Sequence, residues 1–424
     1  MRFIHTADWH LGNQMHDIDR QEEAQAFLRC LKNQITEKNA DTLIVAGDIF
    51  DTANPSAKSQ RLYYTFLSWL KGTCCKNVVI VGGNHDSAVM LDSSKRLLEV
   101  LHIHVVGSIN NLSADDMCFE LWDADDTVCG ICMAVPFVRE VELRALLTEK
   151  VDDGDVYGKA YTLLYEQVYA AAEKLRAGRN IPIIATGHLY AADLEGRLAD
   201  VAGNVKTDDG VKVLDVLGTL GNVPPSVFPP VDYVALGHIH YTTMVAKNPA
   251  VRYSGSPFVM GFDETTIPHF VLCGDLSTDG AGHRLTIEKI ETPTTFVYRR
   301  ILGTLAEIET ALRSFASLQS KKPVYLELCY KKEIGVNAQD FLEEAIAALP
   351  ENVTVASWKI YEHEKAFSEA GFSSFDAVEI RNLDDREIFT QLILSRSGLD
   401  PQDDEAKSVL ARFLPYFLQV AEEV

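Results

Sequence analysis

The sequence has no long apolar segment and little cysteine. No run approaches the roughly 18 apolar residues that a bilayer-spanning helix needs, and Asp8 and His10 stand where a secretory signal peptide would be apolar. Eight cysteines in 424 residues are too few for a disulfide framework and suit a reducing compartment. We therefore expect a cytoplasmic protein that makes no contact with a membrane.

Positive charge is scarce as well. The chain has 39 Lys and Arg against 61 Asp and Glu, a formal net charge of -22. A chain this acidic does not coat nucleic acid by bulk electrostatics, so action on a polyanion would need metal cations, a local basic patch or a basic partner. The 47% hydrophobic and 24% charged residues are ordinary for a globular protein. The length predicts two or three domains at about 100–200 residues each.

Residues 1–275 alternate short apolar runs with helical periodicity. Strands of the buried type at 2–6, 42–46 and 77–81 are separated by helical patterns over 21–38 and 62–70. The pattern continues with strands at 128–135, 182–186, 231–236, 251–253 and 270–273 and a long helix at 157–175. Strands that are apolar throughout and are covered by helices predict a parallel or mixed sheet of an α/β fold.

The composition changes after this part. Turn-forming residues at 276–284 predict a domain boundary. In 285–360 two strands flank each helix, an order that resembles a small ferredoxin-like layer. The segment 362–424 is acidic and carries two apolar stripes at helical spacing. We expect these helices either to fold back on the small domain or to dock on a partner helix.

Five short segments place a polar, ligand-type residue directly after a buried strand. In an open α/β sheet the carboxyl ends of the strands meet at one edge, so these side chains are expected to converge there. The segments are Asp8-Trp9-His10, Gly47-Asp48-Ile49-Phe50-Asp51, Gly82-Gly83-Asn84-His85-Asp86, Gly187-His188 and Gly237-His238-Ile239-His240.

The donors in these segments are carboxylate, amide and imidazole groups, without thiolate. This mixture suits Mn²⁺, Fe²⁺ or Zn²⁺ better than Ca²⁺ or Mg²⁺ alone, and seven ligands match two ions that share a carboxylate. Two ions about 3.5–4 Å apart clamp a phosphoryl group for in-line attack. A neighbouring imidazole can protonate or stabilise the leaving oxygen. We expect two divalent ions, Mn²⁺ first, with Fe²⁺, Mg²⁺ or Zn²⁺ as alternatives.

The order D-x-H, G-D-x-x-D, G-N-H-D, G-H and G-H-x-H resembles the calcineurin-like metallophosphoesterase superfamily. The fuller strings HTADWHLG, VAGDIFDT, GGNHDS, IIATGHL, DYVALGHIH and VRYSGSP resemble its SbcD-type nuclease subunits, which are relatives of the double-strand-break repair nucleases. The resemblance is close over 1–275 and looser beyond. It implies a metallophosphoesterase β-sandwich flanked by helices (1–275), a small α+β capping domain (285–360) and a helical C-terminal tail (362–424).

The resemblance also divides the ligands between two ions and adds two catalytic residues. It places Asp8, His10 and His240 on one ion and Asn84, His188 and His238 on the other, with Asp48 bridging. His85 would be the general acid or transition-state stabiliser, and Asp51 would orient it. Some nuclease relatives have histidine where this chain has Asp51.

The implied activity is hydrolysis of DNA phosphodiesters, exonucleolytic at double-stranded ends and endonucleolytic at hairpins or single strands. The implied partner is an SbcC-type coiled-coil ATPase held by the C-terminal helices, in a heterotetramer that contains a homodimer of this chain and acts in DNA repair and recombination. One alternative is a calcineurin-like phosphatase or cyclic-nucleotide phosphodiesterase, which accounts for the ligands but not for the small domain and the tail. The other is a metal-free interaction scaffold, but every ligand position is filled.

Other polar residues have weaker signals. Asn13, Gln14, Arg20, Lys58 and Arg61 are candidate DNA contacts or, equally, solvated surface. The same alternatives hold for the basic residues of the small domain, which are Arg299, Arg300, Lys321, Lys322, Lys331 and Lys332. We expect Asp86 to hydrogen-bond the backbone of its turn and His5 to lie in the core. Cys129 and Cys132 are expected to be buried thiols rather than half of a zinc site.

Overall fold

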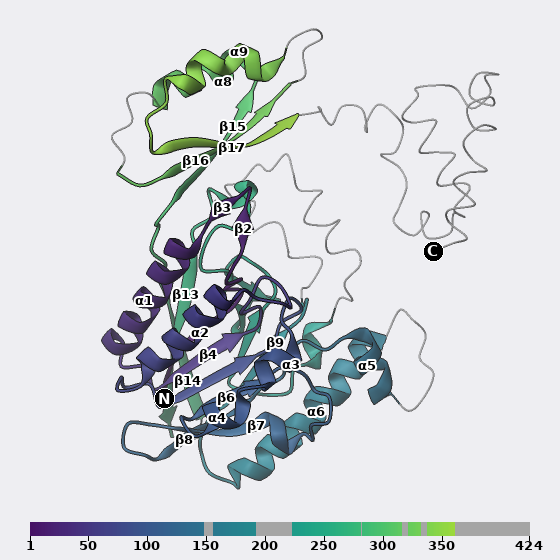
Figure 1. Ribbon diagram of the computed structural model, residues 1–424. Coiled ribbons are helices and arrows are strands. Elements are labelled where there is room, and N and C mark those ends of the chain that lie inside the picture. Colours follow the sequence, from purple (N-terminus) through teal and green to yellow (C-terminus); the bar gives the residue numbers. More distant parts are fainter. Residues whose placement is uncertain (148–155, 192–222, 281, 316–320, 332–336, 361–424) are drawn as a thin grey trace, which may run out of the picture.

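A computed structural model of the chain describes residues 1–147, 156–191, 223–280, 282–315, 321–331 and 337–360. Figure 1 shows a large unit of strands and helices with a smaller unit above it. No helix within these ranges is long and apolar enough to cross a bilayer. The helices expected in 362–424 lie outside the described residues, as does most of the loop region between the two Gly-His motifs.

The first sheet of the large unit is mixed, as expected from its apolar strands. Its strand order is β14-β13-β1-β4-β5-β6, with β1, β4, β5 and β6 parallel and β13 and β14 antiparallel to their neighbours. The strands are β1 (Arg2–Thr6), β4 (Thr42–Ala46), β5 (Asn77–Val81), β6 (Ile103–Val106), β13 (Phe270–Asp279) and β14 (Gly282–Glu291).

The second sheet packs face to face against the first. Its order is β11-β12-β10-β9-β8-β7. The strands are β7 (Cys118–Trp122), β8 (Val128–Met133), β9 (Ile183–His188), β10 (Tyr233–Gly237), β11 (Thr243–Val245) and β12 (Asn248–Tyr253). Phe3 and Ile44 of the first sheet meet Ile184, Tyr233 and Ala235 of the second in one buried cluster. The predicted β-sandwich is therefore present.

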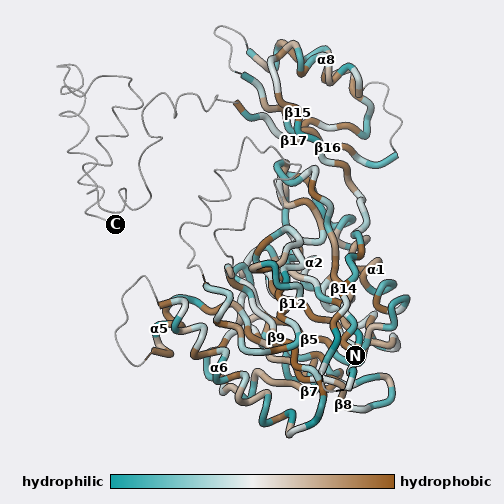
Figure 2. Tube along the Cα trace, turned by 180° about the vertical axis from the view of Figure 1, so that it is seen from behind, coloured by the Kyte–Doolittle hydropathy of each residue, from teal (hydrophilic) through white to brown (hydrophobic). Residues whose placement is uncertain are grey.

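Helices cover the outer faces of this sandwich. Helices α1 (Gln21–Glu37) and α2 (Ala57–Leu70) pack on the first sheet, and α6 (Val156–Arg176) packs on the second. Figure 2 shows hydrophobic residues along the central strands, while α1 and α6 alternate between hydrophobic and hydrophilic positions, as amphipathic helices do. Shorter elements complete the unit, namely β2 (Gln14–Met15), β3 (Ile18–Asp19), α3 (Ala88–Asp92), α4 (Lys95–Glu99) and α5 (Glu140–Leu146).

The turn-forming residues at 276–284 do not separate two domains. They lie at the turn end of the β13–β14 hairpin, which turns at Gly280 and extends the first sheet. The chain leaves this sheet after Glu291, and the small unit begins with β15. The composition is misleading here because β14 is an edge strand whose residues are mostly exposed or half-buried.

The small unit is a three-stranded sheet covered by two helices. It consists of β15 (Val297–Gly303), α8 (Leu305–Phe315), β16 (Val324–Tyr330), α9 (Ala338–Ala347) and β17 (Val353–Ile360). All three strands are parallel, in the order β15-β16-β17. The ferredoxin-like expectation was therefore wrong, because each helix is a crossover that returns the chain in the same direction.

The small unit is seated on the sandwich through a hydrophobic cluster. Met15 and Ile18 of the β2–β3 hairpin and Phe262 pack with Phe296, which directly precedes β15, and with Tyr298 on β15. Figure 1 shows this hairpin directly beneath the small sheet.

Candidate metal centre

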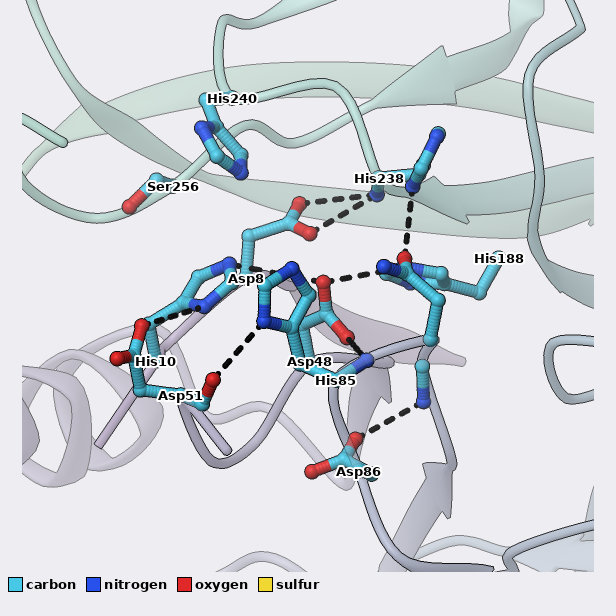
Figure 3. Close-up of polar contacts among 12 residues, drawn as sticks. Asp8, His10, Asp48, Asp51, His85, Asp86, His188, His238, His240 and Ser256 are labelled. Carbon is cyan, nitrogen blue, oxygen red and sulfur yellow. Dashed lines mark hydrogen bonds and ion pairs between the residues drawn. The ribbon is translucent and has the colours of Figure 1, made fainter. Parts of the chain in front are cut away.

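The expected side chains converge where the strands of both sheets end (Figure 3). The loops after β1 and β4 run side by side, because the amides of Asp8 and His10 donate to the carbonyls of Gly47 and Asp48, each at 3.0 Å. Asp8, His10 and Asp48 have positive φ angles of 53°, 42° and 50°. Such strained backbone is found where the surrounding structure holds a functional residue in place.

Two glycines allow the ligands of different strands to approach. Gly47 has φ +93°, and a Cβ there would overlap the ring of His188. A Cβ on Gly83 would overlap the carboxylate of Asp48. The absence of a side chain at both positions is thus a condition for bringing β4, β5 and β9 together at this edge.

One group of ligand atoms comprises Asp8, His10 and His240, which lie within 4.8 Å of one another. Asp8 and His10 are buried, and both oxygens of Asp8 accept from the main-chain amide of His238 at 2.9 and 3.2 Å. Neither ring nitrogen of His10 makes a hydrogen bond within the described part of the chain. A metal ligand binds its ion through one ring nitrogen, and the buried Nε2 of His10, which has no hydrogen bond, is available for this, while Nδ1 lies 3.2 Å from the Asp51 carboxylate.

A second group lies on the other side of Asp48. Asn84 Oδ1 is 3.0 Å from both His188 Nε2 and His238 Nδ1. Asp48 Oδ2 is 3.3 Å from His188 Nε2 and 3.5 Å from His10 Nε2. One carboxylate oxygen therefore faces both groups, the position a bridging ligand requires.

The hydrogen bonds of His188 decide whether this donor set fits a cation. Its Nδ1 is 2.9 Å from the carbonyl of Ala46, and since a carbonyl only accepts, Nδ1 carries the hydrogen. The lone pair of Nε2 in the neutral ring then faces the oxygens of Asp48 and Asn84. Acceptors that converge in this way need a proton or a metal ion between them. The residues present therefore fit divalent cations.

Burial and the close approach of charged groups shift the pKa values of the residues in this cluster. Burial disfavours charge on His188, but the facing Asp48 carboxylate outweighs it and raises the pKa of His188 to about 9. Burial also opposes ionisation of Asp48, yet the charges of His188 and His10 hold its pKa below the usual range. Burial and the neighbouring His188 lower the pKa of His238 to about 3, which keeps His238 neutral and able to bind a metal.

His85 lies at the exposed side of this cluster, with its ring edge-on to that of His10. Its Nδ1 donates to the main-chain carbonyl of Asp51 at 2.9 Å, and its amide donates to Asp48 at 2.9 Å. The Asp51 carboxylate lies 3.2 Å from His10 Nδ1 and accepts from Asn13 at 2.9 Å. The expected orienting contact on His85 is therefore made by the backbone of Asp51, because the side chain faces His10.

Two carboxylates support the cluster without joining it. Asp86 accepts from the amides of Ile49, Phe50 and Gly83 at 2.9–3.1 Å, as expected for a turn-holding residue. Glu264 lies 3.8 Å from His240 Nδ1, and its other oxygen accepts from the amide of Met260 at 2.8 Å. Sequence reasoning missed Glu264, because it lies in a short turn (Phe262–Glu264) that carries no motif.

His5, the cysteines and Arg20 lie outside the metal cluster. His5 is buried and bonded to Tyr233 and Leu236, and the cysteines are free thiols, with Cys132 buried and Cys129 half-buried. The grouping of Arg20 with candidate DNA contacts was wrong, because Arg20 is only 4% exposed and pairs with Glu23.

The remaining candidate DNA contacts divide by exposure and by pairing. Lys58 is exposed and pairs with Asp19. Arg300 pairs with the buried Glu327 inside the small unit, so the positive charge of Arg300 is neutralised within that unit. The candidates that are exposed are Gln14, Arg61, Arg299, Lys321, Lys322 and Lys331, and Lys332 lies outside the described ranges.

The sandwich and its edge cluster are those of the calcineurin-like phosphoesterases, whose family model matches residues 1–242. The chain is 33% identical to the SbcD subunit of the nuclease SbcCD from Escherichia coli (strain K12) over 84% of this chain and 83% of that protein. It is 32% identical to the SbcD subunit of Rhodobacter capsulatus over 68% and 70% of the two chains. The SbcD subunit of Bacillus subtilis is 29% identical over 62% and 63%. The chain therefore belongs to the SbcD family of calcineurin-like phosphoesterases, and it is a metal-dependent phosphoester hydrolase.

Proposed function

We propose that this chain is the nuclease subunit of an SbcCD-type complex. It would hydrolyse DNA phosphodiesters, as an exonuclease at double-stranded ends and as an endonuclease at hairpins and single strands. The observation that carries this proposal is the convergence of carboxylate, amide and imidazole donors on either side of Asp48 Oδ2. The 33% identity to the Escherichia coli nuclease supports DNA as the substrate.

Two divalent ions would be held by this cluster. Asp8, His10 and His240 are assigned to one ion, and Asn84, His188 and His238 to the other, with Asp48 shared. When bound, such ions supply an activated water and neutralise the charge that develops on the phosphoryl oxygens. We propose Mn²⁺ as the physiological ion, since the donor set mixes oxygen with imidazole nitrogen and has no thiolate.

His85 would act on the leaving oxygen. Because its Nδ1–H is committed to the Asp51 carbonyl, Nε2 is the ring atom left to face a substrate, and the side chain is exposed. In the protonated ring Nε2 donates to the leaving oxygen and stabilises or protonates it. Asp51 contributes the carbonyl that fixes the ring and a carboxylate that faces His10.

The remaining units would supply substrate selection and partner binding. We propose that the small unit caps the site and helps to select DNA ends, and that 362–424 binds an SbcC-type ATPase in a heterotetramer with two copies of this chain. The net charge of -22 disfavours DNA binding by this chain alone, and a basic surface on the partner would supply the missing attraction to DNA. A cytoplasmic location fits such a complex and the free thiols.

The test compares wild type with His85→Ala on labelled linear duplex DNA in Mn²⁺, with and without the ATPase. The variant should bind two Mn²⁺ per chain but cleave about 10²–10⁴-fold more slowly, the range for loss of a general acid. His283→Ala removes an imidazole from β14, outside the site, and should cleave like wild type. Undiminished cleavage by His85→Ala would remove His85 from the mechanism. Hydrolysis of a chromogenic monoester without DNA cleavage would favour a phosphatase instead.

A further inference from the structure

A buried ion pair lies between the metal cluster and the small unit. Arg20 and Glu23, at the start of α1, are each 4% exposed, and the guanidinium donates from Nε to Glu23 Oε2 at 2.8 Å. The guanidinium carbon also lies 4.8 Å from the ring centroid of Phe258 and 5.5 Å from that of Tyr298. Arg20 is thus held by an aromatic ring of the sandwich and by one of the small unit.

The small unit makes a polar bond to this pair. The hydroxyl of Tyr298 on β15 donates to Glu23 Oε2 at 3.2 Å, across 275 positions of the sequence. Tyr298 also belongs to the hydrophobic cluster that seats the small unit on the β2–β3 hairpin. The geometry of Glu23 and Arg20 therefore depends on where the small unit sits.

In the other direction the pair reaches the metal cluster. Arg20 donates from Nη1 to Asn13 Oδ1 at 2.9 Å, and Asn13 donates from Nδ2 to Asp51 Oδ1 at 2.9 Å. That same oxygen lies 3.2 Å from His10 Nδ1. The amide of Asn13 has one orientation that satisfies both neighbours, because a guanidinium only donates and a carboxylate only accepts.

We propose that Asn13 and Arg20 are positioning residues that couple the seat of the small unit to the catalytic edge of the site. The chain of bonds runs from Tyr298 through Glu23, Arg20 and Asn13 to Asp51. Asp51 faces His10 with its side chain and holds His85 with its carbonyl, so a displaced small unit would misplace both imidazoles. This inference rests on the proposed function and specifies how the same site is controlled.

The test needs a substrate that does not reach the small unit. We would use the smallest phosphodiester that the wild-type chain cleaves in Mn²⁺, from bis(p-nitrophenyl) phosphate up to a short single strand. Tyr298→Phe removes only the hydroxyl and keeps the ring, so the fold should be retained. Asn13→Ala breaks the chain of bonds next to Asp51. Tyr325→Phe is the matched control, because it removes a hydroxyl from the ring that stacks on Tyr298 at 5.8 Å but lies outside the chain of bonds.

Positioning predicts a lower kcat with unchanged KM and two Mn²⁺ per chain. We expect kcat to fall about 3-fold in Tyr298→Phe and about 10-fold in Asn13→Ala, well below the 10²-fold that a 1 Å misplacement can cause. The double variant should match Asn13→Ala alone, since residues in one network are not additive. Arg20→Lys, which keeps the charge but lacks the planar fork, should also lower kcat.

Three results would count against this coupling. Equal kcat in Tyr298→Phe and Tyr325→Phe would refute it, and so would effects of Tyr298→Phe and Asn13→Ala that multiply in the double variant. Both results would leave the nuclease proposal intact, because wild type would still cleave. A wild-type chain that cleaves neither DNA nor any smaller diester would refute the proposed function and the coupling together.

Discussion

Replacing Gly47 with alanine should displace His188, a proposed metal ligand, while leaving the fold in place. The substitution has two effects, a side chain at φ +93° and an overlap of its Cβ with the ring of His188. Gly72 has nearly the same backbone, with φ +88°, but nothing lies within 4 Å of a Cβ placed there. Gly72→Ala is therefore a control that carries the backbone strain alone.

The magnitudes follow from these two contributions. A non-glycine residue in left-handed backbone costs about 1–2 kcal/mol, which is the full effect expected for Gly72→Ala. Overpacking adds about 1–3 kcal/mol, so Gly47→Ala should lower the free energy of unfolding by about 2–5 kcal/mol. The ring of His188 would have to leave the carbonyl of Ala46, its partner at 2.9 Å, and with it the oxygens of Asp48 and Asn84.

Denaturant unfolding, metal analysis and DNA cleavage measure these effects separately. Gly72→Ala should be destabilised but should bind two Mn²⁺ and cleave normally. Gly47→Ala should retain about one Mn²⁺ per chain and lose most of its activity, since the ions of a dinuclear site act together. If both variants bound two ions and cleaved alike, His188 would not be a ligand held by this close approach.

Two further substitutions test the carboxylates that support the site and the small unit. Glu264→Gln removes the charge 3.8 Å from His240 Nδ1 and should weaken Mn²⁺ binding about 10–100-fold in a metal titration without a comparable loss of stability. Unchanged affinity would show that Glu264 does not hold His240. Glu327→Gln leaves Arg300 and Lys359 without the buried carboxylate that pairs with both, and should destabilise the small unit. Because both cations are partly exposed, we expect the free energy of unfolding to fall by about 2 kcal/mol. Breaking a fully buried pair would lower it by about 3–5 kcal/mol. Thermal unfolding measures the loss in Glu327→Gln, and Glu309→Gln, in an exposed pair with Arg313, should destabilise the small unit much less; equal losses would refute the burial argument.

The sequence predicts the central strands well, for a physical reason. The strands β1, β4 and β5 occupy the predicted residues. After one polar residue, β4 and β5 are continuous apolar runs followed by glycine, and β1 is a short run of β-forming residues before the Asp8-Trp9-His10 motif. Their ends carry the proposed ligands, so the approximate place of the site follows from the motifs. The edge strand β14 alternates between exposed and half-buried residues and carries no such signal.

The finer parts of the site depend on contacts that a linear pattern does not contain. Nothing in the motif indicates that Asp51 meets His85 with its carbonyl and His10 with its carboxylate, since that depends on the turn after β4. Glu264 reaches His240, and Tyr298 reaches Glu23, only once distant segments are folded together. The sequence pattern predicts a surface position for Arg20 at the start of a helix, but in the folded chain Arg20 is buried under the small unit.

The bond from His188 to Ala46 joins the last residue of β9 to the last residue of β4, so it links one sheet to the other. A nascent chain that has made only β1, β4, β5 and β6 of the first sheet lacks His188, His238 and His240, three of the proposed metal ligands, and should not cut a phosphodiester. Hydrolytic activity should therefore appear late during synthesis, after both sheets have closed on each other. A partly made or misfolded copy would then pose no danger to the chromosome of the cell that makes it.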